Sequence, residues 1–443
     1  MTPLDQILQD CGNTLRSATA AVPTSATLSQ EIIDAKAAQA RGYYLPDEDE
    51  RLREVFARYL ELRAALRSVV QTMEPWVEKK EILPREQQLK VFIVGFTAAC
   101  YIVRSGHFLI NFAQERPVVR DKLDEGEICY NIPRKSFTQI FRLQSSVRRM
   151  WKFHEAHLFY QENRDEVLEL ESNKDLSDLV QLLRGEEPFM EKRSQAYWKH
   201  RFHYRFHAWR RRRRSSFNKT MFHLFEVSGR TISELRDPTT GLKRSPKRAV
   251  GKPCADVKVL LEPGDVIITR HKDALSNLFL PGFWPHGALF VGEVGGAAGN
   301  VVEAKKDGVK VRELEETLTV DAFIVLRANL PREHREEAAR RALGHVGKLY
   351  DFAFDFRQSE RLACTALIYR SWHSVENIRF NLIEAGGRLC LSAEELISQG
   401  LSESENSEPL FKIAAFFGPE AEEIDSSLDA KKEFLKTLSG GKC

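Results

Sequence analysis

The chain has 443 residues, which corresponds to roughly three domains of about 150 residues or to two larger ones. Hydrophobic residues make up 42% of the chain and charged residues 29%, a composition that supports folded cores and excludes a disordered polymer. The formal net charge is only +3, which excludes a polycation that binds nucleic acid by bulk charge alone.

The first half of the sequence predicts helices. From Pro46 to Met73, apolar residues recur at three- and four-residue spacing, and acidic residues crowd the start, where the helix dipole favours them. Further helical patterns cover residues 86–113, 136–162 and 176–184. We therefore expect an all-α helical domain over residues 1–240, and the sequence does not indicate its role.

Two features of this half bear on membranes and location. The longest uncharged apolar run, Val91–Val103, has 13 residues, whereas a membrane-spanning helix needs about 20. A buried helix, and no transmembrane segment, is expected there. The N-terminal residues MTPLDQILQDCGNTL show neither the basic region nor the apolar core of a secretory signal, so we expect a cytoplasmic protein.

Residues 201–220 form a basic segment with eight Lys or Arg residues and no acidic residue. Phe202, Phe206 and Trp209 recur at helical spacing and could pack one face on a core. Three roles are open for its arginines: a solvated or ion-paired surface, contact with anionic lipid, and contact with nucleic acid. The five consecutive arginines are Arg210, Arg211, Arg212, Arg213 and Arg214. His203 and His207 have metal-like spacing but lack an HExxH context, so no metal site is expected.

Residues 237–253 mark a domain boundary. The segment DPTTGLKRSPKRAVGKP holds three prolines, two glycines and five basic residues without apolar periodicity. Such a composition is typical of a linker or a long surface loop. The second domain is therefore expected over residues 255–443.

The second domain opens with short β-rich runs punctuated by glycine. The runs expected to form strands are Val257–Leu261, Asp265–Thr269, Gly287–Val291, Val301–Glu303, Gly308–Arg312 and Ala322–Leu326. Two helices follow, one from Pro331 to near Gly344 and one that begins close to Cys364. Strands followed by helices predict an α+β domain.

The seven cysteines show no CxxC spacing, which argues against a disulfide framework and a standard zinc motif. Cys364 stands where a helix is expected to begin, after the turn-like stretch FRQSERLA. A helix N-terminus stabilises a thiolate, and its free backbone amides can hold an oxyanion. The alternative for Cys364 is a small, buried core residue.

His286 and Glu303 are candidate partners of this thiol. His286 stands at the mouth of an expected strand, directly after a Trp-Pro turn, where side chains reach a cleft. Glu303 lies on the next expected strand, from which a carboxylate could hold one imidazole nitrogen and direct the other toward a thiol. The strand register is open, and the alternative for Glu303 is a solvated carboxylate. Competing groups are Cys390, His271, His345 and His373, with the three histidines expected at the surface or in loops.

Five short motifs carry a family resemblance. PGDVIITR, FWPHGALFVGE, VVEA, GKLYDFAFDF and ACTALIYRSW follow one another over roughly residues 260–375. In this order they resemble the permuted papain-like cysteine amidases of the YaeF/YiiX type, circularly permuted relatives of the NlpC-type cell-wall peptidases. The resemblance implies a circularly permuted papain-like α+β domain, in which the histidine strand precedes the cysteine helix.

The resemblance also implies roles for individual residues. Cys364 is expected to be the nucleophile, His286 its general base and later acid, and Glu303 the residue that orients the imidazole. Tyr350 matches a tyrosine near the oxyanion site, with a half-buried structural aromatic as the alternative. Asp265 is expected to cap a turn.

Together these features predict a cysteine hydrolase that cleaves an amide bond in a peptide-like or N-acyl substrate, without a metal or organic cofactor. One alternative is a thioester-forming lipid acyltransferase or deacylase at a membrane surface, although the Asn-Cys-Glu-His signature of that branch is absent from the LACTAL segment. Another is a catalytically silent domain whose helical half binds a partner. The oligomeric state is not indicated.

Overall fold

The computed structural model describes residues 3–78, 83–173, 176–193, 247–270, 284–294, 297–385, 387–402, 408–421 and 423–426, with the single residues 430 and 434. The chain divides into two compact units, Met1–Phe217 and Asn218–Cys443. The expected limits 1–240 and 255–443 stay a prediction, because the boundary segment lies partly outside the described residues. The arginine run Arg210–Arg214, with His203 and His207, also lies outside them.

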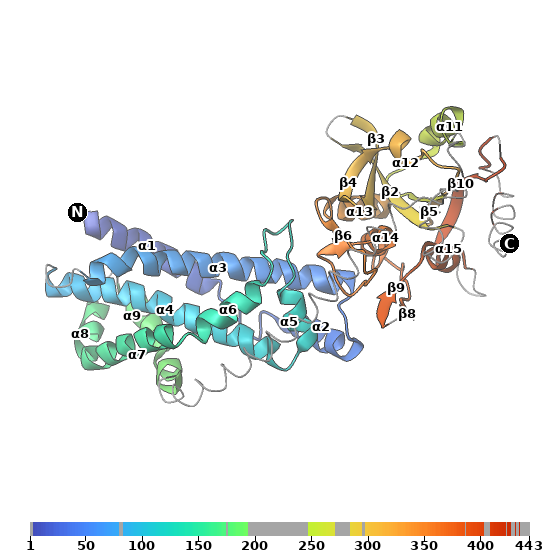
Figure 1. Ribbon diagram of the computed structural model, residues 1–443. Helices are drawn as coiled ribbons and strands as arrows, with labels where there is room; N and C mark the ends of the chain where they lie inside the picture. Colours follow the sequence, from blue (N-terminus) through green and yellow to red (C-terminus); the bar gives the residue numbers. More distant parts are fainter. Residues whose placement is uncertain are drawn as a thin grey trace. The chain divides into compact units, whose positions relative to one another are not determined.

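The first unit is built on two long helices that run side by side, α3 (Pro46–Glu78) and α4 (Arg85–Gln114) (Figure 1). Around them lie α1 (Pro3–Ala20), α2 (Ser29–Arg41), α5 (Pro117–Leu123), α6 (Ser136–Gln144), α7 (Val147–Glu162), α8 (Arg164–Glu169), the 3-10 turn η2 (Leu170–Ser172) and α9 (Ser177–Gly185). In the described part of this unit, every named element is helical, as the sequence predicts.

The helix expected over residues 136–162 is interrupted. Helix α6 ends at Gln144 and α7 begins at Val147, with two serines between them. The Ser145 hydroxyl donates a hydrogen bond to the Phe141 carbonyl at 2.8 Å. Serine side chains that bond to the backbone compete with helical hydrogen bonding, which accounts for a break that apolar periodicity does not reveal.

The apolar run Val91–Val103 lies inside α4, where most of its side chains are buried in the core of the first unit. By length and composition α4 could cross a membrane, with a mean hydropathy of 1.5 over its most apolar stretch. However, 61% of that stretch is buried within the unit. A core helix satisfies the same criteria, so the helix is only weak evidence for a membrane span.

The second unit combines helices with an antiparallel sheet of order β10-β5-β1-β2-β3-β4. The strands are β1 (Val266–Arg270), β2 (His286–Val294), β3 (Ala297–Lys305), β4 (Gly308–Glu313), β5 (Ala322–Ala328) and β10 (Phe411–Phe417). Two short pairs accompany it: β6 (Leu349–Tyr350) with β7 (Arg361–Leu362), and β8 (Ile383–Ala385) with β9 (Arg388–Cys390). The helices are α11 (Lys252–Leu260), α12 (Leu314–Thr317), α13 (Arg332–Leu343), α14 (Cys364–Trp372) and α15 (Ala393–Leu401).

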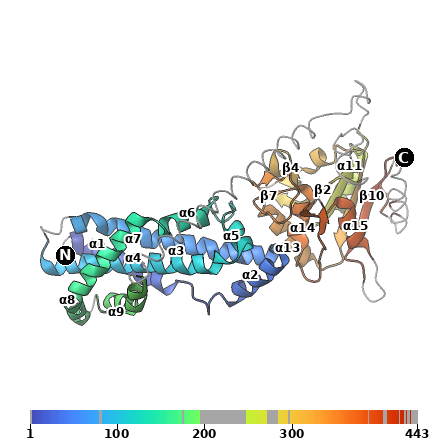
Figure 2. The ribbon, with the colours of Figure 1, turned by 60° about the horizontal axis from the view of Figure 1, so that its bottom comes forward.

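Both faces of this sheet are buried, because side chains alternate between two cores. Ile268, Leu289 and Val302 belong to the core that includes residues of α13, α14 and α15. Ile267 and Phe290 belong to a second core that includes residues of α11 and α12. Helices α13 and α14 pack against each other and against β2 (Figure 2), and so the start of α14 is held close to the sheet.

Five of the six expected strands are present. The prediction of the first one in chain order is wrong. Val257–Leu260 forms the last turn of α11 and Leu261 is its C-cap, so this run is not a strand. Pro253 near the helix start favours helix initiation, and only one face is covered: Val257 is buried while Val259 is 87% exposed. The sequence interpretation also missed β10, which pairs with β5 at the edge of the sheet.

Candidate active site

Cys364 is the first residue of α14 and is only 2% exposed. It follows Ala363, whose backbone is extended, so the chain turns into the helix directly at the thiol. The sulfur accepts backbone N–H hydrogen bonds from Gly287 and Thr365. Negative charge on the sulfur is therefore stabilised by two amide dipoles and by the helix N-terminus.

His286 and Glu303 meet on neighbouring strands. The antiparallel register pairs Glu303 of β3 with Ala288 of β2, which places the carboxylate diagonally across from His286. His286 Nε2 and Glu303 Oε1 are 2.7 Å apart. The imidazole also hydrogen-bonds Cys364, and Nδ1 is the nitrogen left for that bond. The structure thus brings together all three residues that the sequence proposed as a triad.

Two cations hold the second oxygen of Glu303. Lys305 Nζ lies 2.7 Å and Arg312 Nε 3.2 Å from Oε2, and the Thr317 hydroxyl donates to the same oxygen at 3.5 Å. The glutamate side chain is 1% exposed, and burial opposes its charge. The hydrogen bond to His286 and the charges of His286 and Lys305 outweigh burial and lower the pKa of Glu303 to about 2. The imidazole therefore faces a permanent carboxylate at neutral pH.

Cys364 and His286 form a coupled pair. Burial opposes ionisation of both side chains. This cost of burial is outweighed by their mutual attraction and hydrogen bond. The backbone amides that bind the sulfur and Glu303, which binds the imidazole, add to this effect. The pKa of Cys364 is lowered and the pKa of His286 is raised to about 10. Burial instead raises the pKa of the thiols of Cys11, Cys100, Cys254 and Cys390. Among these, only Cys364 is favoured as a thiolate.

Tyr350 lies close enough to Cys364 for the two to interact electrostatically. Its ring packs edge-on against Phe352 and Phe354, with centroids 4.8 and 6.1 Å away. Burial and the negative charge of Cys364 raise the pKa of Tyr350, and its phenol stays protonated at neutral pH. A protonated phenol within electrostatic range of the thiol can donate a hydrogen bond to a reacting group.

The remaining sequence candidates lie elsewhere in the domain. Asp265 accepts the Glu262 N–H at 2.8 Å and pairs with Arg327, so it caps a turn as expected. Cys390, in β9, has its sulfur 3.6 Å from the Ile383 carbonyl oxygen. His345 follows α13 in a loop, and His271 lies outside the described residues. No group of three or more metal-type ligands occurs in the described part of the chain.

His373, expected at the surface or in a loop, lies in the turn directly after α14 but is not at the surface. His373 is buried at the end of α14, and its Nδ1 accepts the Phe380 N–H at 3.1 Å. A histidine that closes a helix and bonds the following backbone is difficult to recognise from sequence, since its partner lies seven residues further on.

Sequence reasoning missed Lys305 and Arg312, which hold Glu303. Lys305 lies two residues after Glu303 on the same strand, so the two side chains share a face of the sheet. Arg312 pairs with Val301 and is therefore diagonal to Glu303 on β4. The two-residue turn Lys306-Asp307 joins β3 to Gly308, the first residue of β4, whose positive φ favours glycine; this glycine is a signal from which a hairpin could have been expected here.

Gly287 permits the close approach of α14 to β2. A Cβ atom there would lie 2.6 Å from Ile368 Cδ1 and 3.0 Å from Ile268 Cδ1, both in a filled core. We expect Gly287→Ala to destabilise the domain by about 1–3 kcal/mol through overpacking, measured by urea unfolding. Adding Ile368→Val, which removes the clashing methyl group, should restore part of this loss. A double variant with purely additive losses would contradict the contact.

Glu303→Gln keeps the shape of the side chain and removes its charge. The folded-state pKa of about 2 is below the ordinary value of 4.5, so ionised Glu303 stabilises the fold above pH 4.5. That contribution is lost as the pH falls toward 2. The stability gap between wild type and Glu303→Gln should therefore shrink by on the order of 3 kcal/mol between pH 5 and 2. Unfolding curves at several pH values test this, with the exposed Glu293→Gln on β2 as control. A gap that is independent of pH would count against a buried, ion-paired carboxylate.

Comparison with known families identifies a similarity over part of the chain. The family model described as permuted papain-like amidase enzyme, YaeF/YiiX, C92 family, matches residues 260–409. The match includes all the site residues named above and ends just before β10. No curated protein and no solved structure matched the chain. The resemblance in the five motifs is thus confirmed: over residues 260–409, this chain is similar to the permuted papain-like amidases of the YaeF/YiiX type.

Proposed function

We propose that the C-terminal domain is a cysteine-dependent hydrolase that cleaves an amide bond through an acyl-enzyme on Cys364. The observation that carries this proposal is the chain of contacts from the Cys364 sulfur to His286 and from His286 to Glu303. A thiolate with an oriented imidazole is the arrangement that nucleophilic acyl transfer requires. The family match supports the broader class of papain-like amidase or peptidase.

Acylation begins with the ionised pair. The Cys364 thiolate attacks the carbonyl carbon of the amide, and the carbonyl π electrons move to oxygen to give a tetrahedral oxyanion. His286, protonated at neutral pH, then donates its proton to the leaving nitrogen as the C–N bond breaks. The products of this half-reaction are a free amine and a thioester on Cys364.

The oxyanion needs hydrogen-bond donors that are already in place. The first turn of α14 leaves backbone N–H groups without helical partners, and the Cys364 N–H is one of them. The phenol of Tyr350, kept protonated, is a second donor close to the sulfur. We assign these two groups to the oxyanion, while the Gly287 and Thr365 amides hold the sulfur.

In deacylation, the proton transfer runs in the opposite direction, toward His286. After the amine departs, His286 is neutral and removes a proton from water as that water attacks the thioester carbonyl. Collapse of the second tetrahedral intermediate expels the Cys364 thiolate, releases a carboxylic acid and leaves His286 protonated again. Glu303, paired with Lys305 and Arg312, keeps the imidazole ring in one orientation through both steps.

The test is acid-quenched intact-mass analysis of the full chain with a panel of N-acyl and peptidyl amides, together with amine release. Wild type should carry an acyl adduct on Cys364, and Cys364→Ala should carry none. Cys390→Ala is the matched control, because Cys390 is a thiol of the same domain outside the triad. An adduct that persists in Cys364→Ala would refute the assignment. An adduct that turns over only when a lipid or amine acceptor is added would replace hydrolysis by acyl transfer.

A further inference from the structure

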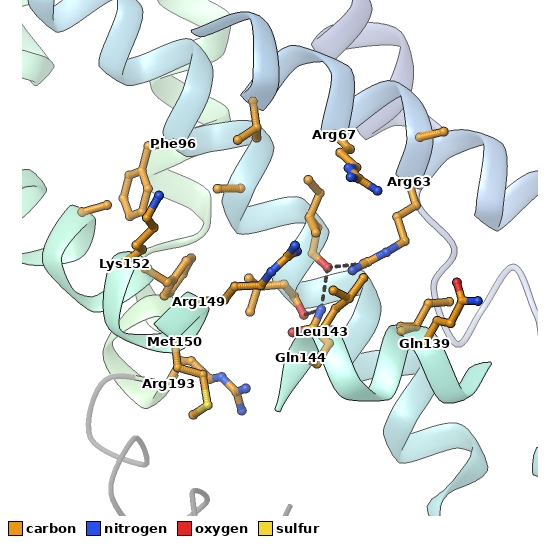
Figure 3. Close-up of a pocket in the computed structure, with 18 of the residues that line it drawn as sticks. Arg63, Arg67, Phe96, Gln139, Leu143, Gln144, Arg149, Met150, Lys152 and Arg193 are labelled. Atoms are coloured by element: carbon orange, nitrogen blue, oxygen red, sulfur yellow. Dashed lines mark hydrogen bonds between the residues drawn. The ribbon is translucent and has the colours of Figure 1, made fainter. Parts of the chain in front are cut away.

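The first unit contains a cavity of about 540 Å³ between α3, α4, α6 and α7 (Figure 3). This volume falls within the range of roughly 300–1,000 Å³ that is usual for small-molecule sites. Most of its wall is apolar, with Leu60, Val70, Phe96, Ile102, Leu143 and Phe153 among the lining residues. The cavity belongs to the helical unit alone, so nothing in this inference rests on the proposed amide hydrolysis.

The charged groups of this cavity have one sign. Its lining includes Arg63, Arg67, Arg149, Lys152 and Arg193, and none of the lining residues that the structure describes is acidic. Figure 3 shows the guanidinium groups of Arg63 on α3 and Arg149 on α7 directed toward each other across the cavity. Solvent screens part of their repulsion, and an anion between them would be attracted by both charges.

Three of these arginines have no carboxylate partner among the described residues. Arg63 donates to the Ile102 carbonyl at 3.0 Å, a neutral acceptor. Arg67 and Arg149 are exposed at the cavity, and neither forms an ion pair within the described part of the chain. Lys152 differs, since its Nζ lies 3.2 Å from Glu74. The unneutralised positive charge therefore resides on the three arginines.

A buried polar group also faces this cavity. His157 lines it and is only 3% exposed, yet its Nδ1 has no hydrogen-bond partner in the described residues. A buried imidazole nitrogen without a partner is costly, and a ligand group would satisfy it. The apolar wall and the three arginines without a carboxylate partner together describe a site for a molecule with an apolar part and one anionic end.

We propose that this cavity binds a long-chain fatty acid, with its carboxylate between Arg63, Arg67 and Arg149 and its acyl chain along the apolar wall. A single acyl chain suits a mostly apolar wall whose charged groups are all cationic. Arginine matches a carboxylate through paired, charge-assisted hydrogen bonds. Exposure of Arg67 and Arg149 places the carboxylate at the mouth of the cavity, where the head group keeps contact with water.

The test measures oleate binding to the full chain by calorimetry, below the concentration at which oleate forms micelles. Arg67→Glu combined with Arg149→Glu reverses two exposed charges that hold no ion pair in the described residues, so the fold should tolerate it. The expected result is an increase in Kd of at least about tenfold. Arg58→Glu is the matched control, since Arg58 is an exposed residue of α3 outside the cavity lining, and its Kd should stay within about twofold of wild type.

Two further experiments test whether binding needs the charged head group and whether the ligand is a free fatty acid or a membrane lipid. Oleyl alcohol, which has the same chain without the charge, should bind at least about tenfold more weakly than oleate. Vesicles of anionic phospholipid should not compete with monomeric oleate. The proposal is overturned if wild type does not bind oleate, if the double variant binds it equally well, or if only vesicles bind. Circular dichroism of each variant confirms that a lost affinity is not lost structure.

Discussion

Cys364→Ala is expected to lower kcat/KM for amide hydrolysis by on the order of 10³-fold or more, because the group that forms the covalent intermediate is absent. The fold should be unaffected, since alanine fits the space of cysteine and is a good helix former at the start of α14. Steady-state kinetics on the full chain measure the loss. Residual activity should reflect substrate binding and oxyanion stabilisation alone.

Cys390→Ala provides the comparison for this experiment. Burial raises the pKa of Cys390, and its sulfur lies near the Ile383 carbonyl, away from the triad contacts. Its removal should leave kcat/KM within about twofold. Equal losses in the two variants, or full activity of Cys364→Ala, would remove Cys364 from the mechanism.

His286→Gln is expected to produce a loss of about 10²–10⁴-fold in kcat/KM, the usual contribution of general acid–base catalysis. It should also change the thiol itself. Without the imidazolium, burial dominates and raises the pKa of Cys364, so little thiolate remains at pH 6. Alkylation of Cys364 by iodoacetamide at pH 6 should therefore slow strongly, and it should recover as the pH rises above 9.

The matched control is His345→Gln, which changes a histidine in the loop after α13 outside the triad. Both its kcat/KM and its alkylation rate at pH 6 should equal those of wild type. If His286→Gln keeps wild-type alkylation at pH 6, His286 does not ionise the thiol, and the lowered pKa of Cys364 must come from the helix N-terminus and the two amides alone.

Much of this architecture could be predicted from the sequence because the signals were local. Apolar spacing predicted α3 and α4. The turn-like stretch before Cys364 predicted that a helix begins close to this residue, and α14 begins at it. The Trp-Pro turn likewise placed His286 at the beginning of β2. These features depend on neighbouring residues only, and local patterns carry that information.

The contact between His286 and Glu303 could be proposed but not established from sequence. Strands β2 and β3 are joined with irregular register at Gly292 and again near Val294. Each such irregularity shifts the pairing, and a one-residue slip moves a side chain to the other face of the sheet. Only the three-dimensional pairing of Ala288 with Glu303 puts the carboxylate diagonal to the imidazole.

Long-range pairing and burial account for the other differences between the sequence prediction and the structure. Strand β10 pairs with β5, although it lies more than 80 residues further along the chain. The residues of β10 alone do not specify that partner. The β-like run Val257–Leu261 becomes helical because only one side of it is covered. In the second case, tertiary context overrides local propensity.

The central claim is that Cys364 is ionised at neutral pH by its contact with His286. The most direct measurement is the pH dependence of iodoacetamide labelling in wild type, with Cys364 and Cys390 followed as separate peptides by mass spectrometry. The labelling profile of Cys364 should lie at lower pH than that of Cys390 and level off well below pH 8.5, while the Cys390 rate falls by about tenfold per pH unit below its raised pKa. A Cys364 rate that rises tenfold per unit up to pH 8.5, as for an ordinary thiol, would contradict the account.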